Sequence, residues 1–524
     1  MNALRTLTIA GAFVLAAFGA QAQTLRIAMT TSDVPTTGGI PDNGSEGGRF
    51  AGYPIYDALV NWDFTRTDAP ADLTPGLATE WSVDPNDPKR WIFTIRDGVR
   101  FHDGSTLTAD DIIWNFDRHL KKDSPHYDTM AASYATYTSQ VAAYEKVGDN
   151  KIALTTKVPF SMLPYLISRV FIVSPRQYEA VGSDWLAFQS KPSGTGPFKV
   201  VSVTRQTSIE LERNADYWDK TRVPKVEKMV LLPIPDANTR VAALRSGQVD
   251  WIEFPMPDSI PSLEAAGFQI VTKPYLHVWS WRFNMVEDGP LKDVRVRQAL
   301  NYAIDREGMV GLLNNTAVPA VGIYARENKY FGEPKNLYTY DPEKAKALLA
   351  EAGYGPDKPI SFSVLLPTAG SGNMVPLPMA EFIQQSLAEF GVNVQYEVAD
   401  WGTVLQGMRT APGSAGVPHR DAINHGQPFG DPTNFYSNVT SMGGISNWGG
   451  YKDEEVDRLM TEAFSTFDQE KQDELIAQAH AIVVDGAPRL FIVHDLNPRA
   501  LAPNVKGFVQ AQSWYQDFTQ VTVE

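Results

Sequence analysis

The chain has 524 residues, a formal net charge of -15 and a sequence pI near 5.1. An acidic balance of this size argues against nucleic acid and anionic lipid as partners, because both are bound through a basic face. The sequence contains no cysteine, which excludes disulfides, thiolate metal sites and a lipid-bearing N-terminal cysteine. A chain of this length exceeds what one hydrophobic core usually supports, so we expect two or three domains.

The first residues have the pattern of a secretory signal. Arg5 precedes an apolar run over residues 7–18, and the small-residue site Ala20-Gln21-Ala22 follows it. The run is shorter than the roughly 20 residues that span a bilayer, so we interpret residues 1–22 as a signal peptide that is cleaved after Ala22. No later apolar stretch is long enough to cross a membrane. The sequence therefore predicts an exported, soluble, periplasmic protein.

Strand-like and helix-like stretches alternate along the rest of the chain, which predicts a mixed α/β architecture. Residues 24–29 alternate like a strand and lead into a loop rich in glycine, proline and aspartate. Residues 91–101 are predicted to form a hairpin with its turn at Asp97-Gly98, because three apolar residues share one face before that turn.

The predicted helices are marked by their ends. Thr108 and Asp111 have the spacing of a capping box, so a helix is expected to start near Ala109. Asp341-Pro342 opens another helix, and Gly353 closes it. Further along, we expect a helix over residues 379–390, a strand over 392–398, and two helices over 454–484 with a break near 465–468.

Blocks of sequence spread over nearly the whole mature chain resemble one protein family. They include residues 72–81 (DLTPGLATEW), 194–198 (GTGPF), 240–250, 293–306 and Gly430-Asp431-Pro432. In this order they resemble the extracellular solute-binding proteins of the dipeptide, oligopeptide and nickel ABC importers. The resemblance implies a bilobal α/β fold of the periplasmic-binding-protein type, with an extra subdomain inserted in the first lobe.

The resemblance also implies a division of the chain. Residues 23–50, 179–272 and 490–524 would form the core of the first lobe, 51–178 the inserted subdomain and 273–489 the second lobe. The chain would cross between lobes near 271–283 and near 489–495. A ligand that touches both lobes favours the closed form, so binding shifts the hinge toward closure.

The partners implied by the family are a small-molecule solute and a permease heterodimer with its ATPases. The protein would dock on that membrane complex without being embedded in the membrane. The ATPases would bind the nucleotide, and this chain has no Gly-x-x-x-x-Gly-Lys-Ser/Thr loop of its own.

Two ligand clamps of the peptide-binding relatives are expected to be missing. Those relatives hold the ligand's ammonium with an aspartate three residues before an acidic-Pro pair, and here that position is Pro428, before Asp431. Dipeptide binders also hold the ligand's carboxylate with an arginine in the loop that matches residues 367–373, which contains no arginine here. A buried ammonium without a carboxylate is costly, so ordinary dipeptide recognition is not expected.

The remaining residues at the expected cleft positions are mostly aromatic and neutral polar, which suits sugars, sugar conjugates or other neutral hydrogen-bonding solutes. Trp401 matches a family tryptophan at the start of a cleft helix. For each other tryptophan, packing in the core is an equally good interpretation. The predicted ligand contacts are Trp401, His425, Gln427, Asn447, Trp448, Trp279, Trp281, Arg282, Tyr53, Asp33, Ser371 and Asn373.

Alternatives to a neutral solute stay open. Arg282 and Arg409 could form a positive site for an acidic solute, and a di- or oligopeptide or an opine-like amino-acid conjugate is the alternative ligand. A ligand sensor that shares the fold without serving a transporter is a further alternative. Asp431 is expected to stabilise its loop rather than to contact ligand.

Enzyme and metal-binding functions are not expected. The acidic pairs Asp110-Asp111 and Glu454-Glu455 could serve acid and base chemistry, but both lie in predicted first turns of helices, where the helix dipole explains them. The eight histidines are scattered and none has His-x-x-x-His spacing. We therefore expect no catalytic residues, no metal and no cofactor.

Overall fold

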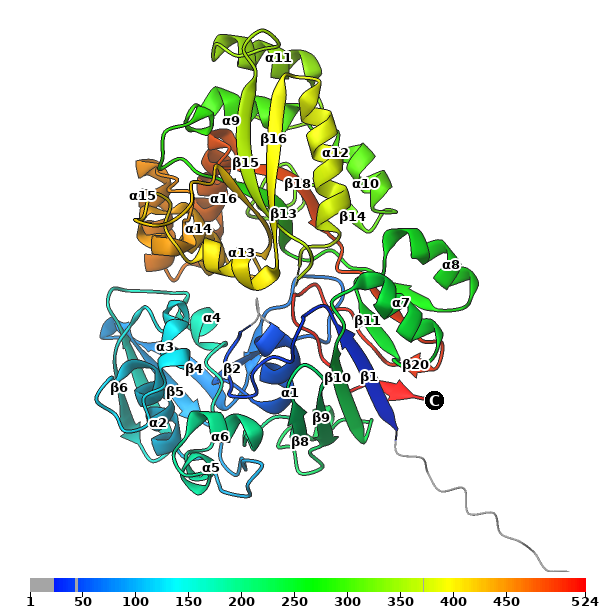
Figure 1. Cartoon of the computed structure of the whole chain (residues 1–524). Helices are drawn as coiled ribbons and strands as arrows, with labels where there is room; N and C mark the ends of the chain where they lie inside the picture. The colour runs from blue at the N-terminus through cyan, green and yellow to red at the C-terminus, as the bar shows by residue number, and fades with distance from the viewer. Residues whose placement is uncertain (1–22, 43–45, 371) are drawn as a thin grey trace, which may run out of the picture.

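The computed structural model describes residues 23–42, 46–370 and 372–524, so the predicted signal peptide lies outside the described residues. Two lobes are each built on one large sheet, and a smaller sheet lies beside the first lobe (Figure 1). Within the described ranges, no helix is long and apolar enough to span a bilayer.

The first lobe contains a seven-stranded sheet in the order β12-β19-β11-β1-β10-β9-β8. The predicted strand over 24–29 is confirmed as β1, which pairs in parallel with β10 and β11 at the centre of the sheet. Leu25 and Ile27 of β1 are fully buried. The strands are β1 (Thr24–Met29), β8 (Phe198–Thr204), β9 (Ser208–Arg213), β10 (Lys228–Pro233), β11 (Trp251–Glu253), β12 (Gln269–Val271) and β19 (Arg499–Leu501), with helices α7 (Ala237–Arg245) and α8 (Ile260–Ala265) between them in the chain.

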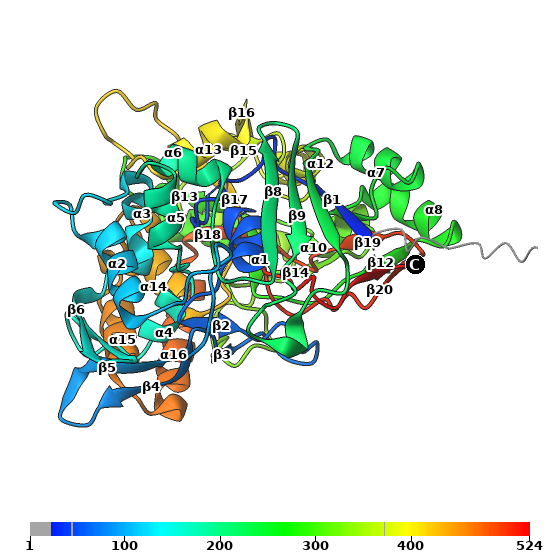
Figure 2. The ribbon, with the colours of Figure 1, turned by 90° about the horizontal axis from the view of Figure 1, so that it is seen from below.

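A smaller antiparallel sheet, in the order β4-β5-β7-β6, lies within the segment expected to be an inserted subdomain. Figure 2 shows it on the opposite side of the molecule from α7 and α8. The capping box is confirmed, because Thr108 and Asp111 exchange hydrogen bonds at the start of α2. The elements are β2 (Val60–Trp62), β3 (Leu73–Pro75), β4 (Ala78–Asp84), β5 (Asp87–Ile95), α2 (Ala109–Leu120), α3 (Thr129–Ser133), β6 (Val141–Gly148), β7 (Lys151–Thr156), α4 (Leu163–Ile167), α5 (Pro175–Ala180) and α6 (Trp185–Ser190).

The predicted hairpin with its turn at Asp97-Gly98 is wrong. β5 ends at Ile95, and its partners are β4, across the turn at residues 85–86, and β7. Beyond Gly98, whose φ is +74°, the chain leaves the sheet and closes a separate small loop through the 2.9 Å bond from Phe101 N to Ser105 O. The apolar alternation correctly predicted a strand that ends near residue 95, but the strand predicted to pair with it was wrong.

The second lobe contains a six-stranded sheet in the order β14-β18-β13-β17-β15-β16. The helix predicted over 379–390 starts earlier, at Pro376, and the break between the last two long helices is confirmed over residues 466–468. The strands are β13 (His277–Phe283), β14 (Ala317–Pro319), β15 (Ile360–Pro367), β16 (Val392–Ala399), β17 (Ala422–Pro428) and β18 (Arg489–Asp495). The helices are α9 (Val294–Tyr302), α10 (Arg306–Leu312), α11 (Pro342–Glu351), α12 (Pro376–Ala388), α13 (Trp401–Met408), α14 (Pro432–Val439), α15 (Glu454–Ser465) and α16 (Gln469–Gly486).

The chain crosses between the two large sheets through residues 272–276 and returns through residues 496–498. The expected boundary at residue 490 assigned most of β18 to the first lobe. β18 instead pairs with β13 and β14, and all of its residues are buried in the second lobe. The return crossing therefore follows Asp495.

Arg306 explains part of the sequence block at residues 293–306. Its side chain is buried, with 4% exposure, and its guanidinium donates to the carbonyl oxygens of Phe491 (2.6 Å), Ala320 (2.7 Å) and Tyr338 (2.9 Å). The fixed fork of five N–H donors suits such a set of carbonyls. Arg306 thus joins the start of α10 to β18 and to two loops.

We expect Arg306→Lys to lower the free energy of unfolding by about 2–4 kcal/mol, because an ammonium cannot reach all of these carbonyls and leaves some of them buried without a donor. Urea denaturation would measure the change. Arg295→Lys is the matched control, because Arg295 is exposed and pairs with Asp293, and its effect should stay within about 0.5 kcal/mol. Equal denaturation midpoints for the two variants would contradict the assignment.

Candidate ligand-binding site

A cavity of about 490 Å³ lies between the two lobes, next to the first crossing segment. Both lobes contribute aromatic and basic side chains to its wall. From the first lobe and the small sheet's segment come Trp62, Tyr134, Tyr137, Arg169, Trp514 and Tyr515, and from the second lobe come Arg282, Trp401, Arg409, His425, Gln427 and Asn438. A solute in this cavity would contact both lobes.

The charges that line the cavity are all positive. Arg169, Arg282 and Arg409 line it, and no aspartate or glutamate does so among the described residues. The Arg409 guanidinium lies 5.8 Å from the ring of Tyr134 across the cleft. A cavity with this lining favours an anionic group.

Arg282, which lines the cavity, and the buried Arg489 have no carboxylate partners in the described part of the chain. The guanidiniums of both residues donate to the side-chain oxygens of Gln427 (2.7 and 3.2 Å) and Asn438 (2.9 and 3.0 Å). Burial lowers the pKa of Arg282 to about 10 and lowers the pKa of Arg489 as well. Two buried cations that share two neutral amides leave positive charge uncompensated, and an anionic ligand would balance it.

Trp401 and His425 each have a buried ring nitrogen without a hydrogen-bond partner among the described residues. Asp400 caps α13 and so places Trp401 at its first position. The rings of Trp401 and His425 are 6.3 Å apart, and the two buried nitrogens are Trp401 Nε1 and His425 Nδ1. Burial lowers the pKa of His425 well below its usual range, so the imidazole is neutral near pH 7. Gly370 packs against the indole, since a Cβ there would lie 2.6 Å from it.

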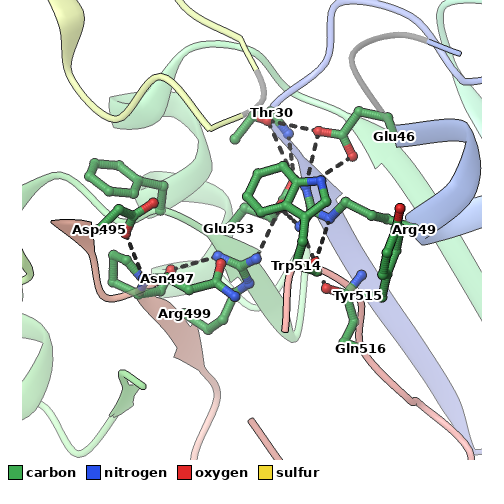
Figure 3. Close-up of polar contacts among 12 residues, drawn as sticks. Thr30, Glu46, Arg49, Glu253, Asp495, Asn497, Arg499, Trp514, Tyr515 and Gln516 are labelled. Carbon is green, nitrogen blue, oxygen red and sulfur yellow. Dashed lines mark hydrogen bonds and ion pairs between the residues drawn. The ribbon is translucent and has the colours of Figure 1, made fainter. Parts of the chain in front are cut away.

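A buried ionic network supports Trp514 on the first-lobe side (Figure 3). The Arg49 guanidinium carbon lies 4.0 Å from the Trp514 ring, and Arg49 Nε donates to the Trp514 carbonyl (3.1 Å). Arg49 also pairs with Glu253 and Glu46, and Arg499 lies 3.3 Å from Glu253. The network joins the cavity floor to β11 and β19 in the first lobe.

One ion pair links the lobes directly. Arg169 Nη2 lies 2.5 Å from Asp431 Oδ2, and both side chains are almost completely buried. Asp431 also accepts from Thr433 N (2.9 Å) and so caps α14, which agrees with its expected role in stabilising the loop. The pair can form only while the lobes are in contact.

The strand alternation of β13 and β17 decides which predicted contacts reach the cavity. His425 lies opposite Ser280 in the ladder, so it shares a face with Arg282 and Gln427. These three residues and Trp401 line the cavity. Trp279 and Trp281 point from the other face of β13 and have 0% exposure, so the structure places them in the core rather than on the cavity wall.

The other predicted contacts in the second lobe also have structural surroundings, outside the cavity lining. Trp448 is buried and donates through Nε1 to Thr410 O (3.1 Å), whereas Asn447 donates to the carbonyls of Thr440 and Tyr451. Asn373 is fully buried, and its carbonyl accepts from Trp279 Nε1. These contacts hold the loops around the cavity.

The remaining predicted contacts lie elsewhere. Tyr53 is buried in the first lobe and donates to Ser168 O (3.2 Å). Asp33 pairs with Arg205 (2.5 Å) near the surface. Ser371 lies outside the described residues.

Sequence reasoning missed most of the first-lobe wall, namely Trp62, Tyr134, Tyr137, Arg169, Trp514 and Tyr515. The sequence around Arg169 does contain a pattern that predicts a buried charge. Arg169 is the single charged residue in the apolar stretch over residues 159–174, and a charge in such a stretch needs a buried partner or a ligand.

Comparison with known proteins identifies the family. The model for bacterial extracellular solute-binding proteins, family 5 Middle, matches residues 72–447. The chain belongs to this family. Heme-binding protein A of Haemophilus influenzae is 30% identical over 90% of this chain and 87% of its own length. The dipeptide-binding protein of Escherichia coli is 28% identical over 90% of this chain and 89% of its own.

Solved structures confirm the expected fold. An ABC transporter-associated periplasmic binding protein from Helicobacter pylori, in complex with peptide STSA, superposes with a TM-score of 0.82 at 24% identity, covering 96% of this chain and 98% of that one. The family 5 resemblance and the bilobal α/β fold are therefore confirmed. The protein is a substrate-binding component of an ABC importer of the peptide and nickel class.

We expect Arg169→Met to shift the hinge toward the open form, because closure would then bury Asp431 without its partner at a cost of about 3–5 kcal/mol. Small-angle X-ray scattering should give a larger radius of gyration than for the wild type. Arg205→Met removes an ion pair within the first lobe and should leave the radius unchanged. The same radius for all three proteins would contradict a role for the pair in closure.

Proposed function

We propose that the protein captures a peptide-class solute with a free carboxylate, either a peptide or an amino-acid conjugate, and delivers it to the permease of an ABC importer. The observation that carries the proposal is the cavity lining, in which Arg282 and Arg409 have no ion-pair partner and no aspartate or glutamate takes part among the described residues. Arginine suits this role because its planar fork binds a carboxylate through two parallel hydrogen bonds.

The same lining gives a free ammonium group no charged partner. Pro428 lines the cavity where peptide-binding relatives are expected to have an aspartate. An ammonium would also approach the Arg282 guanidinium, which lines the cavity without a carboxylate partner among the described residues, and this is unfavourable at short range. The amino end of the solute is therefore proposed to be acylated, substituted or directed away from this wall.

A neutral sugar, the ligand expected first from the sequence, has less support. The Escherichia coli relative is named a dipeptide-binding protein, and the Helicobacter pylori structure holds a peptide. A neutral solute would also leave the buried guanidiniums without a counter-charge. The peptide or amino-acid conjugate, first considered as the alternative, agrees better with the relatives and with the cavity.

The aromatic residues of the cavity are proposed to bind the part of the solute that carries no charge. Trp62, Trp401 and Trp514 line the cavity together with tyrosines from the first lobe. Indole and phenol rings supply apolar contact area and polar edges. An apolar side chain or an acyl group on the solute would pack against them while its carboxylate lies near the arginines.

The site of action is proposed to be the periplasm. The signal pattern over residues 1–22 supports export, and the Helicobacter pylori structure is that of a periplasmic binding protein. The closed protein is proposed to dock on a permease heterodimer driven by its ATPases.

Isothermal titration calorimetry with four probes tests the ligand class. These are phenylalanyl-leucine, its N-acetyl derivative, its C-terminal amide and maltose. We expect the N-acetyl derivative to bind at least as tightly as the free dipeptide. The amide should bind at least about tenfold more weakly, because it has lost the group that the arginines hold. Tight maltose binding, or equal binding of amide and acid, would overturn the proposal.

Two cavity variants should weaken binding of the N-acetyl dipeptide. Arg409→Gln should raise its Kd by about tenfold through loss of a charged partner. Trp401→Ala should cost more than ~1 kcal/mol through loss of ring contact. Arg458→Gln is the control for the charge change, because Arg458 is exposed on α15 and pairs with Glu455. If the control weakens binding as much as Arg409→Gln, a specific role for Arg409 is refuted.

A further inference from the structure

Two arginines lie opposite each other in the sheet of the second lobe. Arg282 of β13 and Arg489 of β18 are paired residues in the antiparallel ladder, and their exposures are only 7% and 3%. Like charges directly opposite each other in a sheet are destabilising. Burial lowers the pKa of Arg489, and the charge of Arg282 lowers it further. This pair of charges therefore needs a compensating group.

Gln427 of β17 contacts both guanidiniums and also lines the interlobe cavity. Its Oε1 accepts hydrogen bonds from Nη2 of Arg282 (2.7 Å) and from Nη2 of Arg489 (3.2 Å). A guanidinium only donates hydrogen bonds, so the amide has to turn its oxygen toward the two arginines. Its amino group, Nε2, is thereby directed away from them.

The amino group of Gln427 is a donor that a solute can reach. No described residue accepts from Nε2, and Nε2 is not among the buried side-chain nitrogens that lack a partner. Because the side chain is partly exposed and lines the cavity, Nε2 retains accessible surface there. In a cavity whose charged residues are arginines, such a donor suits a carboxylate oxygen.

Asn438 of α14 is the second amide that the arginines share, at 2.9 and 3.0 Å. Its amino group Nδ2 is already used, because it donates to Asn434 O (2.8 Å) within the helix. A carboxylate at position 438 would place an oxygen against that carbonyl. Position 427 is thus the one where a carboxylate of the same shape could replace the amide without loss of a hydrogen bond within the protein.

A neutral amide at position 427 leaves the charge of Arg282 and Arg489 uncompensated, whereas a carboxylate there would pair with both. We propose that Gln427 determines the charge preference of the interlobe cavity. Its neutral side chain leaves the compensation of the two arginines to the carboxylate of the solute, and Nε2 donates a hydrogen bond to that carboxylate. This inference rests on the proposed function, since it takes a carboxylate as the group that the cavity binds.

Titration calorimetry of Gln427→Glu with N-acetyl-phenylalanyl-leucine and its C-terminal amide tests the inference. The wild type should bind the acid at least about tenfold more tightly than the amide. In Gln427→Glu the Kd of the acid should rise about tenfold or more, because the new carboxylate takes its place beside the arginines, while the Kd of the amide should change less than about threefold. Gln385→Glu is the matched control, because Gln385 is exposed on α12 and the change in charge is the same.

A second measurement needs no ligand. Differential scanning calorimetry of the ligand-free proteins should give a higher unfolding midpoint for Gln427→Glu than for the wild type, because the new carboxylate compensates two buried guanidiniums. Gln385→Glu should leave the midpoint unchanged, since its side chain is exposed. A side chain that only packed in the wall would not link a higher midpoint to the loss of preference for the acid.

The outcomes separate this inference from the proposed function. Equal binding of acid and amide by the wild type overturns the proposed function and the role of Gln427 together. If the wild type prefers the acid and Gln427→Glu keeps that preference, the role of Gln427 alone is overturned. A midpoint for Gln427→Glu that is no higher than those of the wild type and Gln385→Glu also overturns it.

Discussion

Two short segments, residues 272–276 and 496–498, carry every covalent connection between the two large sheets among the described residues. The two segments lie side by side, because the strands that they connect are paired: β12 with β19 in the first lobe, and β13 with β18 in the second. The lobes can therefore turn about one narrow axis. The interlobe cavity borders the first of these segments. A ligand in the interlobe cavity therefore lies close to the hinge axis and contacts both lobes.

The charge of the interlobe cavity differs in sign from the net charge of the chain. The whole chain carries a net charge of -15, yet the charged residues that line the interlobe cavity, among those the structure describes, are arginines. A basic cavity in an acidic protein concentrates its field at the site instead of spreading it over the surface. The buried network of Arg49, Arg499, Glu46 and Glu253 balances two guanidiniums with two carboxylates and lies within the first lobe, so it can keep the floor under Trp514 rigid while the hinge moves.

Sequence reasoning succeeded where the signals were local. The capping box at Thr108 and Asp111 could be predicted, because it depends on residues three positions apart. The orientation of β13 could not be predicted, because all seven of its residues are buried and a strand buried on both faces has no polar alternation. Trp279, Trp281 and Arg282 therefore looked equally suitable as ligand contacts. The partner of Arg169 could not be predicted either, since 262 residues separate it from Asp431.

The aromatic wall of the interlobe cavity has an optical consequence. Trp62, Trp401 and Trp514 approach the cavity from both lobes, and indole emission responds to the polarity and charge around the ring. Arg169, which lines the cavity, lies 5.6 Å from Trp62, so a carboxylate bound in the cavity would change the field at that indole. The protein thus contains its own fluorescent reporter of occupancy, and the reporter consists of the side chains that would hold the solute.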